Sequence, residues 1–289
     1  MPNTLCHIAL QAPLNRFFCK DSDLLWGIMA CIIPDIPWIL LRCLLSLQTM
    51  DPYSLRLYTS IQASLVFCLI FSAALAQLSR LPCRIFAILG FNCLFHLLLD
   101  ATQIKWGNGI HLFLPYDWSA LQWQIFWPEY PLGIVITVFG FGYFLRIWPK
   151  VLAQKPRLPD LGPARIFALL CCLLVYLVGP LFLLEDLEKT DYYAIQTLRN
   201  VQARPGKQIE FDRVPYSQTN KTITIFSGEQ LHLSGETPDQ SGIISLQGRF
   251  LSTTTVQTNR YHQHSRIRDW ASLIGLLMTC TLTVQTLIL

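Results

Sequence analysis

Long apolar segments separated by short polar stretches dominate this sequence and leave few folds open to it. They cover about 61–78, 85–100, 132–147, 165–184 and 271–289. A membrane-spanning helix needs about 20 mostly apolar residues, and in a bilayer only helices and closed barrels satisfy every backbone polar group. Charged residues make up 14% of the chain, against about 25% in a typical soluble domain. We therefore expect a mostly α-helical, polytopic transmembrane bundle.

Two shorter apolar segments, at about 4–19 and 22–33, come first and are joined by a polar turn at 20–23. Each is too short for an ordinary helical crossing. We interpret them as a hairpin that is re-entrant or barely crosses, with the N-terminus outside. The alternative is an inside N-terminus with one crossing at 24–47, which would leave Asp35 in the middle of the bilayer at a high energetic cost.

The positions of Lys and Arg predict the orientation, because short cytoplasmic loops are enriched in these residues. The loop at 146–165 carries five of them, namely Arg146, Lys150, Lys155, Arg157 and Arg165. The turn at 79–84 agrees, with Arg80 and Arg84. Alternation of the segments then places 101–131 and 185–270 outside.

The long polar stretch at 185–270 predicts an aqueous module between a bundle at 1–184 and a last transmembrane helix at 271–289. It opens with a polar helix at about 186–202. Period-two alternation follows at 207–213, 222–226, 230–234, 242–250 and 254–261. Five short strands predict a small antiparallel, OB-like barrel. A basic groove with stacking aromatic residues is missing from the sequence, so we do not expect nucleic-acid binding.

His96 and Asp100 form the strongest candidate pair for chemistry. They are four residues apart in an apolar segment, so they share one helical face. An imidazole nitrogen and a carboxylate oxygen so placed can reach one ion. A plain hydrogen bond between helices is the other interpretation, but ionisable groups inside membranes are rare and usually functional. Asn92 lies one turn further back on the same face.

Asp35 and His7 are the next candidates. Asp35 stands between Pro34 and Pro37, which break the helix and hold the carboxylate on a rigid turn. An N-cap for the following helix is an equally good interpretation of Asp35, and a histidine at the membrane interface is the alternative for His7. Together with His96 and Asp100, these residues would form a zinc shell of two nitrogen and two oxygen ligands.

Four motifs in this order resemble a known family. They are Thr-Leu-Cys-His at 4–7, Ile-Ile-Pro-Asp-Ile-Pro at 32–37, His-Leu-Leu-Leu-Asp at 96–100 and Leu-Pro-Tyr-Asp-Trp-Ser at 114–119. The set is similar to the YdjM-like family of predicted metal-dependent hydrolases of the bacterial inner membrane. That family has a remote likeness to zinc-dependent phospholipase C. The resemblance covers about residues 1–150.

The resemblance implies that His7, Asp35, His96 and Asp100 bind a divalent metal, with zinc expected. Members often have another His-containing stretch where this chain has Leu-Arg-Leu-Tyr-Thr-Ser-Ile-Gln at 55–62. His111 or Asp117 is then a candidate to complete the site. Asp117 and Glu129 are the candidates for a general base.

These features lead to two hypotheses of different classes. The first is a hydrolase of the bacterial inner membrane that acts at the outer face on a phospholipid or a lipid-linked phosphate or ester. The second is a non-enzymatic membrane scaffold whose outer β module binds a protein partner, with the His–Asp pairs as buried structural contacts. His262 and His264, near the end of that module, are interpreted as exposed polar side chains in preference to a metal site.

Overall fold

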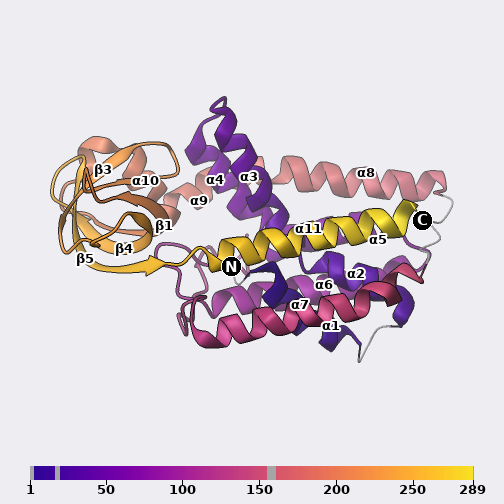
Figure 1. The fold of residues 1–289 in the computed structure, drawn as a ribbon. Coiled ribbons are helices and arrows are strands. Elements are labelled where there is room, and N and C mark those ends of the chain that lie inside the picture. Colours follow the sequence, from indigo (N-terminus) through magenta and orange to yellow (C-terminus); the bar gives the residue numbers. More distant parts are fainter. Residues whose placement is uncertain (1–2, 17–19, 155–160, 289) are drawn as a thin grey trace.

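The computed structural model describes residues 3–16, 20–154 and 161–288, which form a helical bundle with a small β-barrel at one end (Figure 1). The helices of the bundle are α1 (Thr4–Asn15), α2 (Leu24–Ala30), α3 (Ile36–Leu47), α4 (Pro52–Gln62), α5 (Leu65–Ala76), α6 (Pro82–Ala101), α7 (Pro131–Leu152), α8 (Pro163–Val178) and α11 (Ile267–Ile288). Residues 17–19 of the first predicted segment and Lys155 and Arg157 of the predicted cytoplasmic loop lie outside the described residues.

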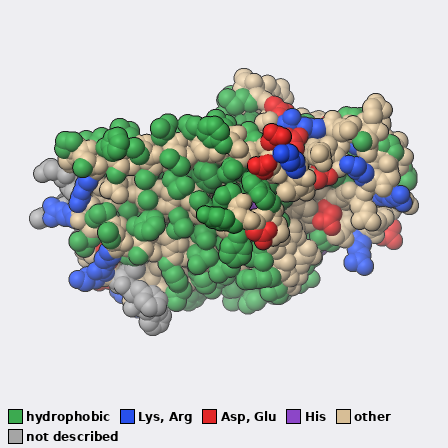
Figure 2. Space-filling view, turned by 180° about the vertical axis from the view of Figure 1, so that it is seen from behind, with side chains coloured by type: hydrophobic (Ala, Val, Ile, Leu, Met, Phe, Trp, Pro, Cys, Tyr) green, Lys and Arg blue, Asp and Glu red, His purple; other side chains and the backbone are tan. Residues whose placement is uncertain are grey.

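Five segments of the described chain are long and apolar enough to cross a membrane. They are Asp21–Leu47, Pro82–Ala101, Pro131–Leu152, Pro163–Lys189 and Ile267–Thr286. Helices α4 and α5 qualify as a sixth only together, and they are bent by 68° at their break. On the face shown in Figure 2, hydrophobic side chains cover the bundle, and Lys and Arg lie at its far end and over the barrel. An exposed apolar surface of this extent is typical of contact with lipid or protein.

Helix α1 lies against α7 and α11 at two glycines. A Cβ atom at Gly140 would stand 2.1 Å from the carbonyl oxygen of Leu5, and one at Gly275 would stand 2.9 Å from Cβ of Thr4. Small residues of this kind let helix backbones approach closely. The side chain of Asn3 caps α1 by accepting from the Cys6 amide at 2.9 Å. These contacts fix the part of α1 that carries His7.

A pair of buried amides ties α1 to α6. Asn15 donates to Asn92 at 3.1 Å, and Asn92 donates back at 2.8 Å. A Cβ atom at Gly27 in α2 would stand 2.7 Å from the Asn15 amide nitrogen, so only glycine leaves room for this pair. Asn92, which the sequence placed on the face of His96, thus serves helix packing.

The C-terminal module is a closed barrel of five strands, as the sequence predicted. The strands are β1 (Gln208–Ser217), β2 (Thr222–Thr224), β3 (Gln230–Gly235), β4 (Gly242–Phe250) and β5 (Thr255–His264), in the order β1-β2-β3-β5-β4. The alternating inward residues form its core, with Ile223, Leu231, Ile244 and Val256 fully buried. The barrel is not wholly antiparallel, because β3 and β5 pair in parallel. A Greek-key path that closes five strands is typical of OB-like folds.

The predicted polar helix at 186–202 is broken in the structure. It forms α9 (Leu184–Lys189) and α10 (Ile195–Arg199), and between them Asp191, Tyr193 and Ala194 adopt the left-handed conformation, with φ of 54°, 55° and 54°. The Asp191 carboxylate accepts from the Thr197 amide at 2.9 Å, which holds the turn. As a result, two buried tyrosines, Tyr192 and Tyr193, face the junction between bundle and barrel.

Candidate metal centre

Four of the predicted ligands come together in one buried cluster. His7 comes from α1, His96 and Asp100 come from α6, and Asp35 ends the 3-10 turn Ile33–Asp35 just before α3. The exposed fractions of His7, Asp35, His96 and Asp100 are 0%, 6%, 0% and 4%. Three separate parts of the chain therefore supply the cluster. Helix α1 brings His7 to it by packing closely on α7 and α11.

The spacing of the side-chain atoms suits a metal ion. Nε2 of His96 lies 3.2 Å from Oδ1 of Asp35 and 4.0 Å from Oδ2 of Asp100, and Nε2 of His7 lies 3.4 Å from Oδ1 of Asp100. Ligands about 2.0–2.2 Å from a tetrahedral zinc ion stand about 3.3–3.6 Å from one another. His7, His96 and Asp100 each offer one ligand atom within 4.8 Å of the others. These three atoms thus have nearly the spacing of zinc ligands, whereas the Asp35 carboxylate lies next to His96 but outside this mutually close group.

The proton of His96 is positioned by a backbone group. Nδ1 of His96 lies 2.9 Å from the carbonyl oxygen of Cys31. A carbonyl only accepts, so Nδ1 carries a proton, and in the neutral ring Nε2 then has a free lone pair. That lone pair faces the carboxylate of Asp35. Two electron-rich atoms at this distance repel each other unless a cation, either a metal ion or a proton on Nε2, lies between them.

His7 has a similar arrangement. Its Nδ1 lies 3.3 Å from the Gln11 side-chain nitrogen, and Oε1 of Gln11 is buried without a hydrogen-bond partner among the described residues. If the amide is turned over, Oε1 accepts from Nδ1, which leaves Nε2 free as a ligand atom. Metal-bound histidines commonly have such a partner on the second ring nitrogen.

Three of the converging atoms have no hydrogen-bond partner among the described residues. They are Nε2 of His7, Nε2 of His96 and Oδ1 of Asp35, and all three are buried. A buried polar atom without a partner costs about 1–3 kcal/mol. Nε2 of His7 and Nε2 of His96 each stand within 3.4 Å of a carboxylate oxygen, a contact that either a proton or a metal ion can fill. The residues therefore fit a divalent metal.

Asp35 stands at the N-cap position of α3, but its side chain makes no capping hydrogen bond. The interpretation of the Asp35 side chain as an N-cap of α3 is therefore wrong. The two flanking prolines predicted a rigid turn at Asp35. That turn directs the Asp35 carboxylate towards His96. The side chain is left free to act as a ligand.

Lys105 is a member of the site that the sequence did not reveal. Its ammonium group lies 3.2 Å from Oδ2 of Asp100, and the residue is only 6% exposed. It neutralises one of the two buried carboxylate charges, so one negative charge remains to be compensated, and an uncompensated buried charge is costly. A lysine five residues beyond Asp100, in a loop rich in aromatic residues, was the only signal in the sequence.

His111 lies outside this cluster. It is buried, its ring packs edge-on against Tyr192 at 4.2 Å, and it interacts with backbone groups of Trp118 and Ser119. Burial lowers the pKa of His111 to about 4. It lines a cavity of about 370 Å³ together with Asp117, and it also lines the cavity of about 620 Å³ whose wall includes Asp100. Its predicted role as a metal ligand remains a prediction that no described contact supports.

The two predicted bases also lie elsewhere. Asp117 is exposed and accepts from the amide and the hydroxyl of Ser119, both at 2.8 Å, and these bonds lower the pKa of its carboxyl. Glu129 accepts from Arg213 at 2.9 Å and contacts Nδ1 of His264 at 2.8 Å. Burial raises the pKa of Glu129, but the nearby histidines and Arg213 lower it by more. A carboxylate with a lowered pKa is a weak base.

Glu129, His262 and His264 form a second group that could hold a metal by its spacing alone. However, Arg213 brings a guanidinium into this group and pairs with Asp269 in α11 at 3.0 Å as well as with Glu129. His264 is buried, which corrects the prediction that it is exposed. We interpret this group as a polar junction between the barrel, the loop before α7 and the start of α11.

Comparisons of the chain with protein-family models, with curated proteins and with solved structures find no match.

Proposed function

We propose that this protein is a membrane-embedded, metal-dependent hydrolase whose metal is held by His7, Asp35, His96 and Asp100. The observation that carries the proposal is the closeness of buried ligand atoms from His7, His96 and Asp100, with the buried Asp35 carboxylate beside His96. The resemblance to the YdjM-like family supports the same four residues as ligands.

A divalent ion in this cluster would polarise a phosphoryl or acyl oxygen and lower the pKa of bound water towards about 7. The protein's own groups would do the rest. The Cys31 carbonyl keeps the Nε2 lone pair of His96 directed into the site. Lys105 stands at the edge of the cluster, where its charge offsets that of Asp100 and would also stabilise negative charge that develops on a substrate oxygen.

The expected location is the bacterial inner membrane, with the barrel on the outer side. Two features support this proposal. The apolar surface of the bundle suits lipid, and the Lys and Arg side chains seen at the end away from the barrel suit a cytoplasmic face (Figure 2). The metal centre, at the barrel end of α6, would then lie near the outer headgroups, where a phospholipid or lipid-linked phosphate or ester is within reach.

Metal analysis of the purified full-length protein tests the proposal. We expect about one zinc ion, or another divalent ion, per chain by plasma mass spectrometry after dialysis, and a loss of most of it in His96→Ala and Asp100→Ala. His232→Ala, at an exposed position in β3, is the matched control and should retain the metal. A folded wild-type protein that binds no divalent ion would exclude this function. The cluster would then be a buried ion pair, as in the scaffold hypothesis.

A further inference from the structure

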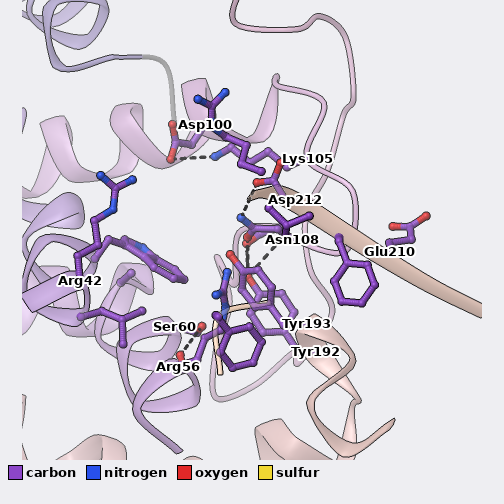
Figure 3. Close-up of a pocket in the computed structure, with 18 of the residues that line it drawn as sticks. Arg42, Arg56, Ser60, Asp100, Lys105, Asn108, Tyr192, Tyr193, Glu210 and Asp212 are labelled. Atoms are coloured by element: carbon purple, nitrogen blue, oxygen red, sulfur yellow. Dashed lines mark hydrogen bonds and ion pairs between the residues drawn. The ribbon is translucent and has the colours of Figure 1, made fainter. Parts of the chain in front are cut away.

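A cavity of about 620 Å³ lies between the bundle and the barrel and reaches the metal centre. Asp100 and Lys105 form part of its wall, so a molecule in the cavity would contact the edge of the cluster (Figure 3). Arg42 of α3 and Arg56 of α4 stand across the cavity from them, and Asp212 and Glu210 of β1 lie on the barrel side. The cavity thus has a charged lining at the level where the two parts of the molecule meet.

The acidic side chains of this lining already have partners. Asp100 pairs with Lys105, and Asp269 pairs with Arg213. The same holds for Glu210, which accepts from the Gly107 amide and from Gln247, and for Asp212, which accepts from Asn108 and Ser245.

Three arginines of the lining, in contrast, have no ionic partner. Arg42, Arg56 and Arg268 line the cavity, and no described carboxylate lies within 4.0 Å of their guanidinium nitrogens. Arginine stays charged at every physiological pH. The lining holds five cations (Arg42, Arg56, Lys105, Arg213 and Arg268) and four carboxylates (Asp100, Glu210, Asp212 and Asp269), a surplus of one positive charge. Arg42 and Arg56 come from α3 and α4 and have no ion pair among the described residues, so this side of the cavity favours an anionic group.

Arg56 is held in place by aromatic rings. Its guanidinium carbon lies 3.7 Å from the ring centre of Tyr193 and 4.4 Å from that of Phe226, and its Nε is buried without a hydrogen-bond partner. Stacking of this kind fixes the planar group, and the fork of N–H groups of an arginine matches a phosphate. Tyr193, in the left-handed turn, and Phe226, in the barrel, thus hold the Arg56 guanidinium in one position.

Apart from Arg42, the α3 side of the cavity carries apolar residues. Leu41 and Leu45 line it, and on the outer surface of the same helix Leu40 and Leu47 are 54% and 62% exposed. The hairpin of α3 and α4 projects from the bundle beside the barrel (Figure 1). A ligand with an anionic head in the cavity would therefore have an apolar surface along α3 for a hydrocarbon chain.

We infer that the cavity is the headgroup site for a phosphate-bearing lipid, with Arg42 and Arg56 as the principal phosphate-binding side chains and Arg268 as a further cation. The inference deepens the proposed function, because it supplies the substrate class and places the phosphate next to Asp100 and Lys105. Two guanidinium groups bind one phosphate through charge-assisted hydrogen bonds, which are stronger than neutral ones.

Native mass spectrometry of the full-length protein in detergent tests the inference with defined lipids. The ligands are phosphatidic acid, diacylglycerol of the same acyl chains, and soluble glycerol 3-phosphate. We expect wild-type protein to bind phosphatidic acid at least tenfold more tightly than either of the other two. Arg42→Ala and Arg56→Ala should each weaken this binding about tenfold. Arg80→Ala, at an exposed position outside the cavity lining, is the matched control and should leave it unchanged.

Equal binding of phosphatidic acid and diacylglycerol, or wild-type binding in both cavity variants, would overturn the inference. If glycerol 3-phosphate binds as tightly as phosphatidic acid, the ligand is a soluble organophosphate and the inference of a lipid ligand is wrong. The melting temperature shows whether the variants are folded, and the metal content separates the two proposals. Arg42→Ala should keep its metal, while His96→Ala should lose metal yet still bind phosphatidic acid. Failure of only one of these two assays would identify which proposal is wrong.

Discussion

The imidazole rings of His7 and His96 lie face to face, with their centres 3.6 Å apart and their planes within 2° of parallel. Two charged imidazolium rings would repel each other strongly at this distance, so at most one ring is protonated in the folded protein. Each ring directs Nε2 towards a carboxylate. A divalent ion held by these residues would account for the charge balance of the cluster. Because a metal binds in the plane of an imidazole ring, the two parallel rings would have to tilt for both Nε2 atoms to bind it.

Removal of the metal should destabilise the folded protein. A ligand at 100 times its dissociation constant stabilises the state that binds it by about 2.7 kcal/mol. We expect a chelator to lower the melting temperature of the wild-type protein by several degrees and zinc to restore it, as measured by differential scanning fluorimetry. His96→Ala should melt at the same temperature with and without chelator. A chelator effect of equal size in that variant would mean that the stabilising ion binds elsewhere.

Gln11 should tune the affinity for the metal without binding it. Gln11→Leu removes the partner of Nδ1 of His7, and loss of such a partner typically lowers metal affinity about 10- to 100-fold. Gln11→Glu keeps an acceptor at this position and should retain most of the affinity. Competition with a chromogenic chelator measures the difference. Wild-type affinity in Gln11→Leu would show that Gln11 has no part in orienting His7.

Gly140 should be required for the position of His7. A side chain at Gly140 meets the backbone of Leu5, whereas one at Gly142 meets no atom within 4 Å. We therefore expect Gly140→Leu to push α1 away from α7, lower the melting temperature and reduce the bound metal to less than half. Gly142→Leu, two residues away on the same helix, is the control and should resemble wild type. Similar behaviour of the two variants would contradict the proposed packing of α1.

Arg204 should hold the barrel together. It is fully buried, contacts Glu229 through both Nη atoms, and donates to the carbonyl oxygens of Leu198 and Thr253. Removal of one partner of a buried ion pair costs about 3 kcal/mol or more. We expect Arg204→Ala to raise hydrogen–deuterium exchange across the barrel strands by at least tenfold, while Arg249→Ala, at an exposed site, has little effect. Unchanged exchange in Arg204→Ala would refute this role.

The sequence by itself determined the kinds of elements. The apolar segments predicted the helices, and period-two alternation predicted all five strands, because the periods of 3.6 and 2 decide which residues share a face. His96 and Asp100 could be paired for the same reason, since both lie on one turn of one helix. Asp35 was a candidate because prolines flank it, and the order of motifs in a family likeness supported Asp35 and His7 as partners, but no local pattern could bring them to His96.

Only the tertiary structure decided which distant side chains meet. His7 reaches His96 because Gly140 and Gly275 admit α1, and Lys105 reaches Asp100 because the loop after α6 folds back. Glu129 was expected as a base but joins Arg213 and His264 in the junction with the barrel. Such contacts depend on helix packing and on where loops return, and neither is encoded in the periodicity of a single segment.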